Sequence, residues 1–246
     1  MYNYFDMSGH SHYATIKRAK EAKDSQRGKI FSKMAREIAI AVREGRGTDP
    51  NFNYKLRMIL DKARSFNMPK SNIERAINSG TSGEALKEVI YEGFGPSGVA
   101  VMVVAATDNH NRTGQEIKNL FERAGGNLGG PGSVSFNFDN KGLILIQKAA
   151  DSQKQMLQLI DLGVEDVEET EDAIEVYVAP DRLNEVRNKL EGANFNIISS
   201  ELCLKPKNFV TISDPKDSEK ILSFLDSLEE HDDVQRVYAN VDILTK

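Results

Sequence analysis

Two histidines near the start of the chain, His10 and His12, are the first residues whose types could carry chemistry. A zinc site needs about four ligands at suitable spacing, and a catalytic thiol needs a histidine beside it. The remaining candidates, His110, His231 and Cys203, lie in distant segments. Cys203 stands between two leucines in an expected strand, where a buried, unreactive thiol is the default. The sequence therefore predicts no metal site, no catalytic residue and no cofactor.

Two polar loops could bind anions. The segment 125–133, "GGNLGGPGS", lacks the Gly-Lys-Ser/Thr ending of a phosphate loop. It also follows a helix and leads into a strand, which is the reverse of a phosphate cradle. We interpret it as a helix-to-strand connection, with close approach to a partner as the alternative. The segment 107–113, "TDNHNRT", joins a strand to a helix start. Its Asn109 and Arg112 either bind a phosphate backbone or merely help to cap and turn the chain, and the sequence leaves both readings open.

An acidic tract at residues 164–172, "VEDVEETED", does not have the spacing of a calcium loop and falls in an expected hairpin. A solvated surface is the simpler interpretation. No cluster of carboxylates has the arrangement that metal-dependent phosphoryl transfer requires.

The basic segment 10–36 is the strongest functional signal. It contains eight cations and only two acidic residues, Glu21 and Asp24. Such a density of positive charge neutralises phosphates and releases counterions. Tyr13 offers a stacking surface and His10 a hydrogen-bonding group. Nothing in the pattern chooses DNA over RNA, and no groove-reading helix-turn-helix signature is evident. The predicted nucleic-acid-binding residues are His10, Tyr13, Lys17, Arg18, Lys20, Lys23, Arg27, Lys29, Lys33, Arg36, Asn109 and Arg112.

The charge of the whole chain is divided unevenly. Residues 1–80 hold 16 Lys/Arg and 8 Asp/Glu, whereas residues 81–246 hold 16 and 29, which gives +8 and −13 and the total of −5. A basic module joined to an acidic body favours a protein that binds nucleic acid or the ribosome. The single cysteine suits a reducing compartment, and neither a membrane span nor a targeting segment is evident. We therefore expect a cytoplasmic protein without a membrane partner or a small-molecule substrate.

Three amphipathic helices are expected within residues 1–80. Ile30, Met34, Ile38 and Val42 recur every four residues and line one face of the first helix. The second helix is expected to start at Asp49-Pro50, and the third to run from near Pro69 to a left-handed C-cap at Gly80. The stretch before Ala22 lacks an apolar stripe, so an extended or loosely ordered arm is expected there.

Strands and helices alternate after residue 81. Residues 87–94, 98–107 and 133–138 read as strands, and residues 112–126 as a helix with a capping box at Thr113 and Glu116. From residue 142 to 206 the order is β-α-β-β-α-β, that of a ferredoxin-like unit. The tail adds one helix, 214–231, and one strand, 234–243.

The tail cannot bury an apolar face alone, so we expect it to complete the sheet that precedes residue 142. The predicted class is α+β, with an N-terminal three-helix domain and two ferredoxin-like α/β sandwich domains, one inserted in the other. The expected domains are 1–80, then 81–140 joined with 207–246, with 141–206 as the insertion.

Several long motifs resemble the YebC family, which is also described as YebC/PmpR-type transcriptional regulatory proteins. They are "GHSHYATIKRAKEAKDSQRGKIFSKMAREI", "MPKSNIERAI", "YEGFGPSGVAVMV", "TDNHNRT", "GGNLGGPGSVSFNF" and "VQRVYANVD". The resemblance covers nearly the whole chain from Met7. The chain departs from the family pattern at His12-Tyr13, where the family usually has Lys-Trp, and at His110, where it usually has a basic residue.

The resemblance implies a helical N-terminal domain, two α/β domains and no enzymatic activity. It also implies one of two roles: a DNA-binding transcriptional regulator, or a ribosome-associated factor that binds ribosomal or transfer RNA and relieves stalling or activates translation. The main hypothesis is a non-enzymatic, nucleic-acid-binding regulator of gene expression that acts through its basic N-terminal region.

Overall fold

The computed structural model describes residues 24–45, 47–82, 86–170 and 173–244. They form two compact units, residues 24–137 with 206–244 and residues 138–205. Within these ranges, no helix has the length and apolar character that crossing a membrane requires. The arm expected before Ala22 lies outside the described residues.

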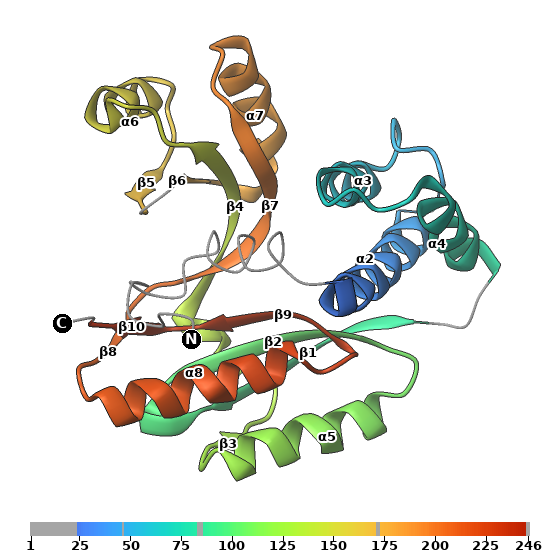
Figure 1. Cartoon of the computed structure of the whole chain (residues 1–246), viewed down its shortest axis with the longest axis vertical. Coiled ribbons are helices and arrows are strands. Elements are labelled where there is room, and N and C mark those ends of the chain that lie inside the picture. Colours follow the sequence, from blue (N-terminus) through green and yellow to red (C-terminus); the bar gives the residue numbers. More distant parts are fainter. Residues whose placement is uncertain (1–23, 46, 83–85, 171–172, 245–246) are drawn as a thin grey trace. The chain divides into compact units, whose positions relative to one another are not determined.

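The first unit begins with three helices that pack around a shared core (Figure 1). They are α2 (Asp24–Glu44), α3 (Tyr54–Ser65) and α4 (Lys70–Ser82). Met34, Ile38 and Val42 of the predicted stripe are buried in this core, and Ile30 packs at its edge. The expected three-helix arrangement is therefore confirmed.

The second helix starts later than predicted. Asp49 and Pro50 lie in a turn in which the Asp49 carboxylate accepts a hydrogen bond from the backbone N–H of Asn51 at 2.9 Å. The helix is capped by Asn53, whose side chain accepts from Leu56 N and donates to the carbonyl of Ala41 at 2.7 Å. One buried amide thus ends the turn and ties α3 to α2, which the Asp-Pro pattern did not reveal.

Gly80 does not end the third helix, which continues to Ser82. It is buried where α4 passes α2, and a Cβ atom at Gly80 would lie 2.8 Å from both the Ala39 carbonyl oxygen and the Val42 Cβ. The glycine therefore serves close approach of two helices rather than a left-handed cap.

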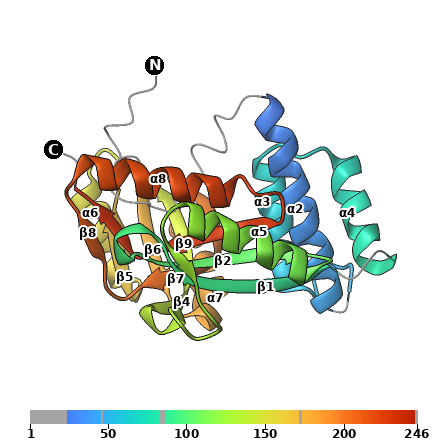
Figure 2. The same cartoon turned by 90° about the horizontal axis from the view of Figure 1, so that it is seen from below.

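The first unit also contains a four-stranded antiparallel sheet in the order β3-β1-β2-β9. Helices α5 and α8 cover one face of it (Figures 1 and 2). Phe121 of α5 meets Phe224 of α8 edge to face at 4.9 Å within a core that includes Val101 and Val103 of β2. The elements are β1 (Lys87–Phe94), η1 (Pro96–Gly98), β2 (Ala100–Thr107), α5 (His110–Arg123), β3 (Asn127–Leu128), η2 (Ser135–Asn137), β8 (Val210–Ile212), α8 (Pro215–Glu229), β9 (Val234–Ala239) and β10 (Val241–Ile243).

Because β9 pairs with β2, the tail completes the earlier sheet, as expected. Two local predictions were wrong, and one strand was not predicted. Residues 133–138 form no strand: Ser135–Asn137 is a 3-10 turn that exposes Phe136, and Phe138 opens the next strand. The predicted strand 234–243 is divided at Asn240, whose side chain accepts a hydrogen bond from Ala100 N at 2.7 Å. Its second half, β10, pairs in parallel with the unpredicted β8.

The second unit is a ferredoxin-like sandwich with strand order β5-β6-β4-β7. Its buried side chains include Ile144, Leu159 and Ile174. Its elements are β4 (Phe138–Gln147), α6 (Ser152–Asp161), β5 (Asp166–Glu169), β6 (Ala173–Val178), η3 (Pro180–Arg182), α7 (Leu183–Gly192) and β7 (Ile197–Pro206). The order β-α-β-β-α-β is as predicted.

The predicted α+β class, with N-terminal helices followed by sheet domains, is confirmed. The strands of this sheet in the first unit have the same spatial order as the strands of a ferredoxin-like unit. Their order along the chain differs, because β1 occupies the place of the third ferredoxin strand but is the first strand of the chain. The domain boundaries at residues 80, 140 and 206 stay a prediction.

The contact of α4 with α2 predicts opposite effects for two glycine substitutions. We expect Gly80→Ala to lower the free energy of unfolding by about 1–2 kcal/mol, because crowding outweighs the gain in helix propensity. Gly28→Ala is the matched control, since nothing lies within 4 Å of its added Cβ. We expect that control to be neutral or stabilising by up to about 1 kcal/mol. Urea unfolding measures both, and equal effects would contradict the packing assigned to Gly80.

Candidate functional site

The turn between α8 and β9 holds a buried carboxylate, Asp233, whose side chain is 8% exposed. Arg36 of α2 donates to its Oδ1 at 2.6 Å, and Arg112 of α5 donates to its Oδ2 at 3.2 Å. The Thr113 hydroxyl also donates to Oδ2, at 2.6 Å. Burial alone would raise the pKa of Asp233, but these hydrogen bonds and the Arg36 charge outweigh it and lower the pKa. Asp233 therefore stays ionised and joins three separate elements.

The loop 107–113 is organised from within. The Asn109 side chain caps α5 by accepting from Arg112 N at 3.1 Å, and Asn109 N donates to the Thr107 hydroxyl at 2.9 Å. Arg112 also pairs with Asp108 at 3.0 Å. The predicted capping box at Thr113 and Glu116 is therefore wrong, because Thr113 lies one turn inside the helix and binds Asp233.

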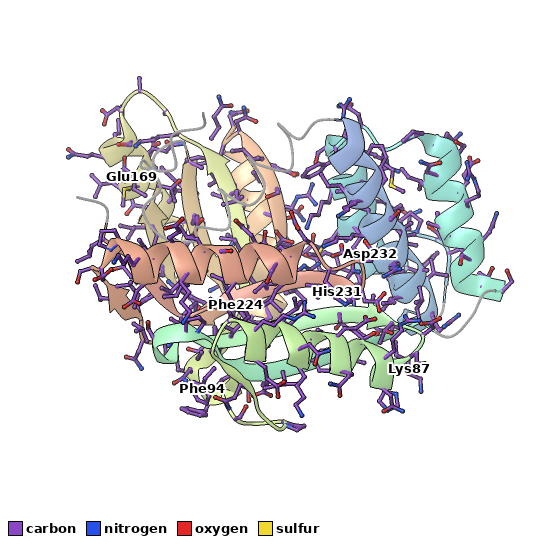
Figure 3. The ribbon with its side chains drawn as sticks, turned by 60° about the horizontal axis from the view of Figure 1, so that its bottom comes forward. Lys87, Phe94, Glu169, Phe224, His231 and Asp232 are labelled. Carbon is purple, nitrogen blue, oxygen red and sulfur yellow. The ribbon has the colours of Figure 1, made fainter. Side chains whose placement is uncertain are left out.

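His231 lies beside this cluster at the end of α8, and Figure 3 shows it with Asp232 at the turn. Its Nδ1 accepts a hydrogen bond from Asp233 N at 3.1 Å, so the ring proton is on Nε2. Nε2 lies 2.9 Å from the Glu116 carboxylate, to which it donates. The imidazole thus links α5 to the α8–β9 turn.

Among the described residues, Glu116, His231 and Asp233 place one potential metal ligand each within 4.8 Å of one another. Two guanidinium groups already occupy the Asp233 carboxylate, and their charges repel a cation. The group fits an ion-pair network better than a metal centre.

The glycine-rich loop closes around a second buried carboxylate, Glu92 of β1, which is 8% exposed. Its carboxylate accepts backbone hydrogen bonds from Gly132, Val134 and Ser135 at 2.8–2.9 Å. The backbone oxygen of Glu92 accepts another from Gly129 at 2.7 Å. Burial would raise the pKa of Glu92, but the backbone donors outweigh it and lower the pKa.

Two family models together match most of the chain. The model described as "TACO1/YebC protein N-terminal domain" matches residues 11–83, and "TACO1/YebC second and third domain" matches residues 86–241. The chain belongs to the TACO1/YebC family.

Relatives support this membership over the full length. A protein of Dictyoglomus turgidum is 46% identical over 242 residues and covers 96% of both chains. A protein of Thermotoga petrophila is 47% identical over 242 residues, with 96% of this chain and 94% of the relative covered. Both are named "Probable transcriptional regulatory protein". The crystal structure of a conserved hypothetical protein from Aquifex aeolicus is 44% identical and superposes with a TM-score of 0.88, covering 96% of this chain and 98% of that one.

The predicted interface residues of this TACO1/YebC protein divide into three groups. His10, Tyr13, Lys17, Arg18, Lys20 and Lys23 lie outside the described residues. Arg27 and Lys29 are exposed near the start of α2. Lys33 contacts the last residue of α8, Arg36 and Arg112 contact Asp233, and Asn109 caps α5.

Sequence reasoning missed the roles of Asp233 and Glu92. The pairing of β2 with β9 places Asp233 next to the end of β2, where Ala106 N donates to the Asp233 carbonyl at 2.8 Å. Assigning that strand pair from the sequence would have brought the 107–113 loop and the acidic residues before Val234 together. No local pattern distinguished Glu92 from the exposed Glu88 of the same strand.

Two further expectations concern the second unit. Cys203 is a buried thiol outside any disulfide, as predicted. The acidic tract carries surface ion pairs: Lys205 contacts Asp166 at 2.5 Å and Glu168 at 2.8 Å, and Lys148 contacts Glu169 at 2.6 Å. Lysines therefore compensate these carboxylates.

Removing the Glu92 charge tests the role of the glycine-rich loop. We expect Glu92→Gln to lower the free energy of unfolding at neutral pH by about 1.5–3 kcal/mol, because a charged acceptor of three backbone hydrogen bonds is lost. The lowered pKa of Glu92 means that its contribution is present above its unfolded value, about 4.3, and is lost as the pH falls through the folded value. The difference between the two proteins should therefore shrink below about pH 4.

Urea unfolding across pH 2.5–7 measures this difference, with Glu88→Gln as the control in the same strand. Glu88 is exposed and its charged oxygen lies 3.7 Å from Lys55, so its change should stay within about 0.5 kcal/mol. A difference between Glu92→Gln and the wild type that does not vary with pH would contradict the assigned role of the carboxylate.

Proposed function

We propose that this protein is a non-enzymatic regulator of gene expression that binds nucleic acid, with DNA as the first candidate, through its basic N-terminal region. The observation that carries the proposal is the excess of cations between residues 10 and 36, in a chain whose remainder is strongly acidic. The names of its relatives support a regulatory role in transcription.

Two exposed cations on α2 continue the basic segment of the sequence on a helix. Arg27 and Lys29 are solvent-exposed and follow directly on the cations at 17, 18, 20 and 23. A run of this length can contact several successive phosphates, whose neutralisation releases counterions and favours binding. Positions in the arm such as Tyr13 and His10 would add stacking and hydrogen bonds.

The second candidate function is a ribosome-associated factor that binds ribosomal or transfer RNA. The packing of α2 favours it, because α2 is covered on one side by the helical core and contacts the α8–β9 turn on another. A helix held in this way is poorly placed to enter a major groove and read base edges. Contacts to phosphates and to single-stranded or structured RNA need no such access.

Salt dependence tests the proposed interface. Reversal of four arm charges, Lys17, Arg18, Lys20 and Lys23 to Glu, should weaken binding to a labelled duplex and reduce the slope of log affinity against log salt by about 3–4. The control reverses four exposed lysines elsewhere, Lys118, Lys154, Lys216 and Lys220. Fluorescence anisotropy at several salt concentrations measures both. Equal losses in the two variants would show a general charge effect and refute the assigned interface.

Sedimentation from lysate and retention of a promoter fragment decide between the two candidate functions. Tagged protein sedimented from lysate should remain free of ribosomes if DNA is its target, and should migrate with ribosomes in an RNase- and salt-sensitive manner if RNA is. Salt-tolerant, sequence-selective retention of a promoter fragment supports transcription. Ribosome co-migration that the arm-reversed variant loses and the control keeps supports translation.

A further inference from the structure

One side of α2 is fastened to the α/β part of the same unit. The Lys33 ammonium donates to the carbonyl of Glu229 in the last turn of α8, and the Arg36 guanidinium donates to the carbonyl of Asp232 at 2.7 Å. Lys33 thus meets a carbonyl group at the C-terminal end of α8, where positive charge is favourable, and Arg36 meets one in the turn that follows. Glu37, which lies one helical turn after Lys33, pairs with Arg236 of β9 at 3.3 Å.

The side chains on this face belong to the region that the charge pattern assigns to nucleic acid. Lys33 is half-buried, and its desolvation lowers its pKa, an effect that the nearby Glu229 and Asp232 oppose. Arg36 is joined by a hydrogen bond to Asp233, which also holds Arg112 and Thr113 of α5. Their donors face the protein's own carbonyl and carboxylate groups.

We propose that Asp233 is a positioning residue: it docks α2 against α8 and β9, and so fixes the orientation of the helix that carries Arg27 and Lys29. In this arrangement Lys33 and Arg36 support nucleic-acid binding through the docking of α2, while Arg27, Lys29 and the arm contact phosphates. The inference rests on the proposed function and deepens it, because it separates cations that orient the interface from cations that form it.

The substitution Asp233→Asn gives opposite results under the two possible roles of the arginines. If Arg36 and Arg112 contact phosphates, removal of an acidic neighbour frees them, so affinity rises and its salt dependence steepens. If Asp233 positions α2, the substitution loosens the docked helix and lowers the affinity, and the number of phosphate contacts in the bound state stays the same. The direction of the change in affinity therefore decides between the two roles.

The experiment compares three single variants of the full chain, Asp233→Asn, Arg36→Gln and Lys29→Gln, by fluorescence anisotropy with one labelled duplex and one labelled single-stranded RNA at several salt concentrations. Asp233→Asn and Arg36→Gln should lower the affinity about 3- to 10-fold with an unchanged salt slope. Lys29→Gln, an exposed control on the same helix, should reduce the slope by about 0.7–0.9. Tighter binding by Asp233→Asn, or a reduced slope with Arg36→Gln, would overturn the proposal.

Hydrogen exchange tests the docking without nucleic acid. Amides of α2 and of the α8–β9 turn should exchange about tenfold faster in Asp233→Asn and in Arg36→Gln than in Lys29→Gln, which corresponds to the loss of about one hydrogen bond to a charged group. Exchange in β1 and β2 should be unchanged, which excludes general unfolding. Unchanged exchange in α2 would overturn the docking role. Absence of wild-type binding to either nucleic acid would instead overturn the proposed function, and exchange would still decide whether Asp233 docks α2.

Discussion

A buried carboxylate that cannot be left uncompensated governs the arrangement of the first unit. Asp233 is almost fully enclosed, and an uncompensated buried charge costs about 3–5 kcal/mol. It is satisfied only when Arg36 of α2, Arg112 and Thr113 of α5, and its own turn after α8 meet at one point. The helical bundle and the sheet are therefore joined by a requirement of charge and hydrogen bonding in addition to apolar contact.

The same principle explains the glycine-rich loop. Segments 107–113 and 125–133 both have features of anion-binding loops, and each is next to an internal carboxylate. Arg112 and Thr113 hold Asp233, and the backbone donors that follow Gly129 hold Glu92. Both loops use their donors to stabilise the fold, and the basic region at residues 10–36 becomes the principal candidate for binding an external polyanion.

Much of the fold could be predicted from periodicity. The stripe on α2, the hairpin of β1 and β2, and the β-α-β-β-α-β order of the inserted unit each depend on local patterns of apolar residues. The errors arose where tertiary contacts override local signals. Asn53 moves the start of α3 by reaching to Ala41, and Gly80 serves the approach of two helices rather than a cap.

The candidate site was harder to predict than the fold. Counting cations located the basic region but could not show that Lys33 and Arg36 face α8 and its turn, because that contact joins residues almost 200 positions apart. The proposed class of binding partner rests on charge density, whereas the proposed division between positioning and contacting residues rests on long-range packing that a single sequence does not display.

The most direct test of the account is a hydrogen-exchange footprint of the full chain with and without bound nucleic acid. Peptides that cover residues 10–32 should gain the strongest protection, and peptides from α6 and α7 should be unchanged. Protection confined to the inserted unit, with residues 10–32 unaffected, would contradict the proposal that the basic N-terminal region is the interface.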